Sequence, residues 1–236
     1  MASIAAIIPA DRARIAATVV SVLIGVALIG LAWGRVVDEM ALLKPASVLA
    51  AVEAGIPVTA AEISGAARAA QAAEDGPVGA RASRIAGQLH MAAAARLGGT
   101  ATLAGLAEYD RAAAQFASAL ADAPADRFAW WWLVSSRWNS AQHLAAAQAW
   151  RAAALSGLFD PELMFARVEG ALALWPYLDI SARQALGAQL VVHWQWGPDG
   201  LAELLARFGA GDVLREALTG RPDIAEDLGR RMAGRR

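Results

Sequence analysis

Cysteine is absent from this chain of 236 residues, and lysine is almost absent. Without cysteine there are no disulfide bonds, no zinc sites built on thiolates and no cysteine nucleophile. The single lysine is Lys44, so 20 of the 21 lysine and arginine residues are arginine. Runs of β-branched residues are scarce after residue 33, whereas alanine, the strongest helix former, is abundant. The part after residue 33 is therefore expected to be all-α, and the arginine and alanine usage is typical of a GC-rich bacterial genome.

An excess of charge of one sign is missing too. Residues 34–123 carry 7 basic and 9 acidic side chains, residues 124–236 carry 12 of each, and the net charge is −1. No extended field of one sign is available to attract a polyanion. We therefore expect no nucleic-acid partner.

The motifs of common catalytic sites are absent. No serine lies in a Gly-x-Ser-x-Gly sequence, since Ser64 and Ser156 each have only one adjoining glycine. Gly197 and Gly200 lack the lysine and the preceding strand of a phosphate-binding loop. Nothing in the sequence therefore marks a serine nucleophile or a nucleotide site.

None of the three histidines is placed for a metal site. His90 and His143 lie out of helical reach of another histidine or of a carboxylate pair with ligand spacing, and His193 lies among large aromatic residues. Zinc and iron sites need three or four convergent ligands. We expect each histidine to be structural, and we expect no metal and no cofactor.

Two groups of carboxylates could suggest the acid–base pair of a sugar-modifying enzyme. One is Glu108 with Asp110, and the other is the acidic group within residues 223–227. The first lies on a helical face, and the second opens the last expected helix, where acids suit the helix dipole. The sequence therefore favours a protein without catalytic activity.

Residues 15–33 form a long apolar run that contains no charged side chain. At 1.5 Å per residue the run spans roughly 28 Å, close to the hydrocarbon thickness of a bilayer. Trp33 lies where an interfacial aromatic residue is expected. The run predicts a single transmembrane helix. The alternatives are a buried core helix and a cleaved signal peptide, for which residues 30–32 have the small-x-small form.

The charges around this run predict its orientation. Arg12 and Arg14 precede it, whereas Arg35 after it is offset by two acidic residues. This bias favours a cytoplasmic N-terminus. The expected location is therefore the bacterial inner membrane, crossed once, with the helical domain in the periplasm.

Proline, glycine and capping residues predict where the helices begin and end. Short helices are expected on either side of Pro45, and the capping-box spacing of Thr59 and Glu62 begins a third. Asp126 is expected to be the N-cap of the helix that begins at residue 127. Further helices are expected over 78–97, 106–121, 127–138, 141–155, 162–174, 180–194, 199–208, 212–218 and 222–233. The predicted segments are a cytoplasmic tail (1–14), a transmembrane helix (15–33), short juxtamembrane helices (34–80), helical repeats (81–175) and a C-terminal helical cap (176–236).

A pattern of small and large residues recurs after 34 positions. The first set is Ala112, Phe116 and Ala119, and it recurs as Ala146, Trp150 and Ala153, each set on one helical face. A period of this length indicates helix–turn–helix repeats that stack side by side.

Residues 108–153 resemble the tetratricopeptide repeat (TPR) family. The residues that carry the resemblance are, in order, Tyr109, Asp110, Ala112, Phe116, Ala119, Pro124 and Trp130. The resemblance implies a TPR-like α-helical solenoid with a concave groove that holds peptides. The chain departs from the family pattern where Arg137 occupies a usually aromatic position and where Pro161 falls three positions late.

A looser similarity extends over residues 108–218. In residues 125–130, 157–162 and 171–175 the chain is similar to single-span repeat proteins encoded with bacterial exopolysaccharide or O-antigen export machinery. This similarity implies a role in cell-envelope polysaccharide biosynthesis or export, with a protein partner in that machinery.

The tryptophans supply the candidate binding residues, since eight of the nine lie between residues 130 and 196. Consecutive helical side chains point about 100° apart, so Trp130, Trp131 and Trp132 cannot share one face. The predicted partner-binding residues are Phe128, Trp131, Ser135, Trp138 and Asn139. By the family pattern Trp131, Ser135, Trp138 and Asn139 face the groove, where aromatic anchors and an amide suit a peptide. The alternative is that Trp131 and Trp138 pack against a neighbouring helix.

Together these features predict a membrane-anchored scaffold or adaptor without enzymatic activity, which binds a protein partner at the bacterial inner membrane. One alternative is a translocon- or chaperone-associated periplasmic repeat protein that binds unfolded clients. A second alternative, from a different class, is a sugar-modifying envelope enzyme.

Overall fold

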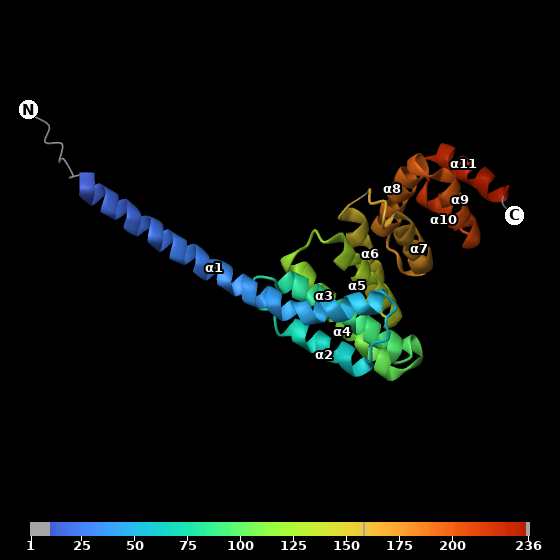
Figure 1. The fold of residues 1–236 in the computed structure, drawn as a ribbon. Coiled ribbons are helices and arrows are strands. Elements are labelled where there is room, and N and C mark those ends of the chain that lie inside the picture. The colour runs from blue at the N-terminus through green and yellow to red at the C-terminus, as the bar shows by residue number, and fades with distance from the viewer. Residues whose placement is uncertain (1–9, 158, 235–236) are drawn as a thin grey trace, which may run out of the picture.

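The computed structural model describes residues 10–157 and 159–234, which form an all-α fold (Figure 1). These residues contain eleven α-helices and two short 3₁₀ turns, and no strand. The α-helices are α1 (Ala10–Glu53), α2 (Ala60–Gln71), α3 (Gly79–Arg96), α4 (Leu103–Asp122), α5 (Arg127–Asn139), α6 (His143–Leu155), α7 (Met164–Leu174), α8 (Ile180–Trp196), α9 (Pro198–Arg207), α10 (Gly211–Ala217) and α11 (Pro222–Ala233). Most of the predicted cytoplasmic tail, residues 1–9, lies outside the described residues.

The N-terminal half of α1 extends away from the other helices as a single rod (Figure 1). Its large apolar side chains are exposed, Leu31 for example by 77%. It is the one described helix that is long and apolar enough to cross a membrane. None of its most apolar stretch is buried, so the segment is not a core helix of this fold.

The predicted break at Pro45 is wrong, because α1 continues through it to Glu53. Proline in a helix interior removes one backbone hydrogen bond and costs about 3 kcal/mol. Packing offsets this cost here, since Leu42 is buried and Leu49 contacts the same apolar cluster of α2 and α3. The Ser47 hydroxyl also donates to the Lys44 carbonyl at 2.8 Å. The segment after the apolar run is thus one continuous helix instead of two short ones.

Helices α2 and α3 pack against the C-terminal half of α1. The predicted capping box begins α2: the Glu62 N–H donates to Thr59 Oγ1 at 3.2 Å, and the Thr59 N–H donates to Glu62 Oε2 at 2.9 Å. Alanines on facing sides let the helices approach closely. Helix α3 also lies close to α4, since a Cβ atom on Gly87 would lie 2.8 Å from the Phe116 ring.

The residues of the 34-residue pattern belong to the buried core of the structure. All six of these residues, in α4 and α6, are buried, namely Ala112, Phe116, Ala119, Ala146, Trp150 and Ala153. Asp126 caps the intervening helix α5 as predicted, with Oδ1 accepting from the N–H groups of Phe128 and Ala129 at 3.0 Å each. Helices α4, α5 and α6 therefore pack in the order in which they occur in the chain.

Helix α7 begins at Met164, two positions later than predicted, so Pro161 lies in the preceding turn and not in the first helical turn. The Asp160 side chain accepts from the Glu162 N–H at 3.2 Å, and this local turn delays the helix. Helices α8 to α11 follow close to their predicted bounds and complete the C-terminal end of the molecule (Figure 1).

Candidate functional site

One groove between α5 and α7 is lined by four of the five predicted partner-binding residues. They are Trp131, Ser135, Trp138 and Asn139, together with Val134 of α5 and Ala166, Glu169, Gly170, Ala173 and Leu174 of α7. This α5–α7 groove has a volume of about 180 Å³. Pockets for small molecules usually exceed about 300 Å³. The groove is therefore of a size for a protruding side chain.

Contacts at two places along α6 fix the direction of the helices that form the groove. At one end, the ring centre of Trp138 of α5 lies 4.7 Å from that of His143 of α6, and the His143 ring centre lies 4.9 Å from that of Tyr177, which follows α7. About two turns further along α6, the Trp150 indole donates to the Arg167 carbonyl in the first turn of α7 at 2.7 Å. Helix α6 thus runs antiparallel to both α5 and α7. Helices α5 and α7 are therefore parallel, with their C-terminal ends at the same end of the groove.

Trp131 packs on a glycine of α7. A Cβ atom on Gly170 would lie 2.9 Å from Cη2 of the Trp131 ring, so the glycine makes room for the indole. Trp131 thus packs against a neighbouring helix, as the alternative interpretation expected, and also lines the groove. Trp138 is more open, at 37% exposure, and closes the end of the groove near His143.

The polar groups of α5 in the groove are partly used within the helix. The Ser135 hydroxyl donates to the Trp131 carbonyl at 3.1 Å, and the Asn139 amide donates to the Ser135 carbonyl at 2.9 Å. An asparagine amide has two N–H donors and a carbonyl acceptor. Asn139 therefore keeps one donor and its acceptor for a ligand, while Ser135 is oriented by its own helix.

Glu169 is the one charged residue among the described residues that line the groove. Glu169 lies 34 positions after Ser135, which is the interval of the repeat pattern. Ala173 lies 34 positions after Asn139. The repeat period thus relates two pairs of residues that line the groove. Extending the period by one more unit is the sequence signal that could have identified Glu169.

Phe128 does not lie in the groove. It belongs to the first turn of α5, where its N–H donates to the capping Asp126 side chain and the Arg127 guanidinium lies 4.9 Å from its ring centre. It is not among the residues that line the groove. The structure therefore separates Phe128 from the other four predicted residues.

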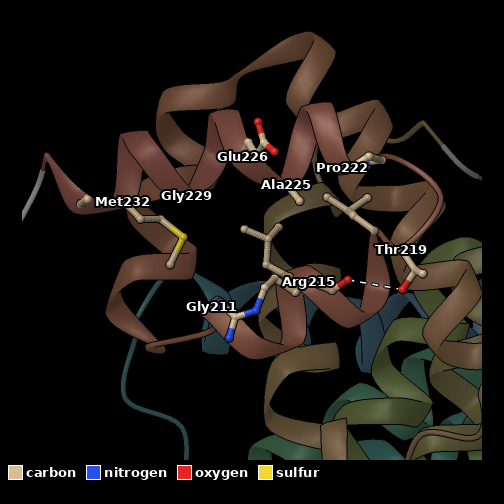
Figure 2. A pocket seen from close by; sticks show the side chains of 11 residues that line it. Gly211, Arg215, Thr219, Pro222, Ala225, Glu226, Gly229 and Met232 are labelled. Atoms are coloured by element: carbon tan, nitrogen blue, oxygen red, sulfur yellow. Dashed lines mark hydrogen bonds between the residues drawn. The ribbon is translucent and has the colours of Figure 1, made fainter.

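A second and larger groove, of about 620 Å³, lies between α10 and α11 (Figure 2). Its lining is mostly apolar, and Arg215 and Glu226 are its charged residues. Met232 enters it from α11, as Figure 2 shows. No sequence pattern indicated this groove, because it depends on how two short helices pack at the end of the chain.

His90 forms a buried pair that sequence spacing did not reveal. Its Nδ1 lies 2.6 Å from Glu108 Oε2, and its Nε2 lies 3.3 Å from Gln71 Nε2. Arg111 also donates to Glu108. The pair links α2, α3 and α4 through the interior and holds Glu108 in a structural position.

His193 is fully buried, and neither of its ring nitrogens has a hydrogen-bonding partner among the described residues. The Phe165 ring packs edge-on against it, with 4.2 Å between the ring centres. Burial lowers the pKa of His193 to about 4, so the side chain is neutral at neutral pH. In the described part of the chain, no group of three or more His, Asp or Glu residues is placed to hold a metal ion.

Comparison with models of known protein families, with curated proteins and with solved structures finds no match to this chain.

Proposed function

We propose that this chain is a membrane-anchored adaptor that binds a protein partner in the α5–α7 groove. The observation that carries the proposal is the gathering of Trp131, Trp138 and Asn139 on the side of α5 that lines the groove with α7. Partly exposed tryptophans are frequent anchors of protein interfaces, and a nearby amide can bind a partner's backbone.

The geometry also supports the TPR-like interpretation, which stays part of the proposal. Helices α5 and α6 form an antiparallel hairpin, and the next groove helix, α7, is parallel to α5. The buried 34-residue pattern and the spacing of Ser135 and Glu169 follow the same period. This arrangement is typical of repeat proteins that present a continuous binding surface.

The proposed location is the inner membrane of a bacterium, with α1 as a single span and the groove in the periplasm. A membrane anchor raises the local concentration of the groove near partners in the same membrane, so a weak contact is sufficient. The process in which the partner acts is proposed to be cell-envelope polysaccharide biosynthesis or export, on the looser sequence similarity alone. The proposal includes no catalytic role, no metal and no cofactor.

Photo-crosslinking in intact cells tests this proposal. A benzophenone amino acid replaces Trp138, which is exposed at the end of the groove, and a control places it at Leu144, which is 68% exposed outside the groove lining. We expect one dominant crosslinked protein from position 138 and a different or no product from position 144. Many products from position 138 would favour the chaperone alternative. Equal products from both positions would contradict the groove as the binding site.

A further inference from the structure

We propose that the α5–α7 groove recognises an arginine or lysine side chain of the partner, with Glu169 as the counter-charge. This inference rests on the proposed function and specifies the chemistry of the partner segment. The features that support it are the isolated charge of Glu169, the direction of the two helices and the two indole rings.

Glu169 is available to a ligand. Its side chain is exposed and lines the groove, and it has no hydrogen-bonding or ion-pairing partner in the part of the chain that the structure describes. The other described residues of the lining are apolar or neutral. A single carboxylate in an apolar groove favours a cation.

The helix ends add to this preference. Because α5 and α7 are parallel, their C-terminal ends, at Asn139 and Leu174, meet at one end of the groove. Helix C-termini carry a partial negative charge that favours cations within the last turn. Both helix ends therefore attract a cation, as the Glu169 carboxylate does.

The neighbouring arginines are engaged elsewhere. Arg137 donates to the Ala145 carbonyl at 3.1 Å, on the side of α5 that faces α6. Arg183 lies over the Trp175 ring at 4.5 Å and donates to Glu216 at 2.5 Å. Neither residue lines the groove, so no described cation of this chain competes for Glu169.

Trp131 and Trp138 complete the cation site. A guanidinium or ammonium group is attracted to the face of an indole, and arginine also stacks on it. The volume of about 180 Å³ suits one extended side chain whose methylene stem contacts the apolar lining. A neutral glycan is less suited, because it carries no charge to pair with Glu169.

The test measures peptide binding to the full chain in detergent micelles by the ¹H–¹⁵N signals of the tryptophan indoles. The signals of Trp131 and Trp138 are assigned from their phenylalanine variants. One probe is a blocked pentapeptide with arginine between leucine and alanine residues. The matched probe carries citrulline, a neutral isostere of arginine, at the same position. The protein variants are Glu169→Gln and, as a control of the same charge change outside the groove, Glu53→Gln.

We expect the arginine peptide to shift the two assigned indole signals and to bind at least about tenfold more tightly than the citrulline peptide. Glu169→Gln should remove most of this difference, and Glu53→Gln should keep it. Equal binding of both peptides at the groove would overturn the cation preference while leaving the groove itself as a peptide site. Binding of neither peptide, together with failure of the crosslink from position 138, would overturn both proposals. A shift of the same signals by a neutral oligosaccharide such as maltoheptaose, with no response to either peptide, would overturn the peptide assignment in favour of a glycan.

Discussion

The Trp150 indole N–H donates to the backbone carbonyl of Arg167 at 2.7 Å, with both residues fully buried. Trp150 occupies the repeat position that Phe116 has one unit earlier. An indole at this position fills the core and also reaches α7 with a hydrogen bond, which a phenyl ring cannot do. This bond links the repeat core to the helix that carries Glu169, and it holds one wall of the α5–α7 groove.

Replacement of Trp150 by phenylalanine tests this link. We expect the free energy of unfolding to fall by about 1–2 kcal/mol, because a buried carbonyl loses a partner and a small cavity remains. The measurement is urea unfolding of the full chain in a non-denaturing detergent, followed by circular dichroism. Trp132→Phe is the control, since Trp132 is partly buried and its indole donates no hydrogen bond within the described residues. An equal loss in both variants would show that the hydrogen bond contributes nothing.

His193 should make the fold sensitive to mild acid. Its folded-state pKa of about 4 lies below the ordinary value of 6.5, so the unfolded chain binds a proton first as the pH falls. The free energy of unfolding is therefore highest above pH 6.5 and falls as the pH decreases toward 4. We expect it to fall by about 2 kcal/mol between pH 7 and pH 5. His193→Leu should lack this part of the pH dependence, and His143→Leu should keep it. Unfolding curves at pH 7, 6 and 5 measure the difference, and parallel loss in the wild type and His193→Leu would exclude His193 as its source.

Gly170 should not tolerate alanine, although alanine is the better helix former. Its Cβ atom would lie 2.9 Å from the Trp131 ring, so the indole must move and the groove must change shape. We expect Gly170→Ala to lose about 1–2 kcal/mol of unfolding free energy. The control is Gly65→Ala in α2, where a Cβ atom meets nothing within 4 Å, and a gain of about 0.5–1 kcal/mol is expected. A gain of similar size in both variants would mean that Trp131 adapts without strain.

The proposed orientation can be measured with reporter fusions. Alkaline phosphatase is active only in the periplasm, so a fusion after Arg236 should be active, and a β-galactosidase fusion at the same position should be inactive. The size of the mature chain separates an uncleaved anchor from a cleaved signal peptide. Release of the fusion protein into the soluble periplasmic fraction would contradict the anchor.

Local sequence signals predicted most of the helix bounds. Thr59 and Asp126 cap their helices as expected, and the residues of the 34-residue pattern are buried as expected. These features depend on residues within one or two turns of each other, which a sequence displays directly. The predicted positions of Trp131 and Trp138 came from the period of the repeat and the family resemblance.

The features that the sequence did not predict depend on distant contacts. Continuity of α1 through Pro45 requires the packing of Leu42 and Leu49 on helices that occur later in the chain. The pairing of His90 with Glu108 joins two helices whose residues are 18 positions apart, which no helical spacing indicates. Phe128, predicted to bind the partner, lies instead in the first turn of α5, where its N–H donates to the capping Asp126 side chain.

The unbroken course of α1 through Pro45 has a mechanical consequence. The helix that contains the apolar run also packs against α2 and α3 through Leu42. No flexible linker therefore separates the apolar run from the other helices. A tilt or rotation of the N-terminal half of α1 would therefore move the other helices with it as one rigid body. With α1 inserted in a bilayer as proposed, the orientation of the α5–α7 groove relative to the membrane would follow the tilt of α1.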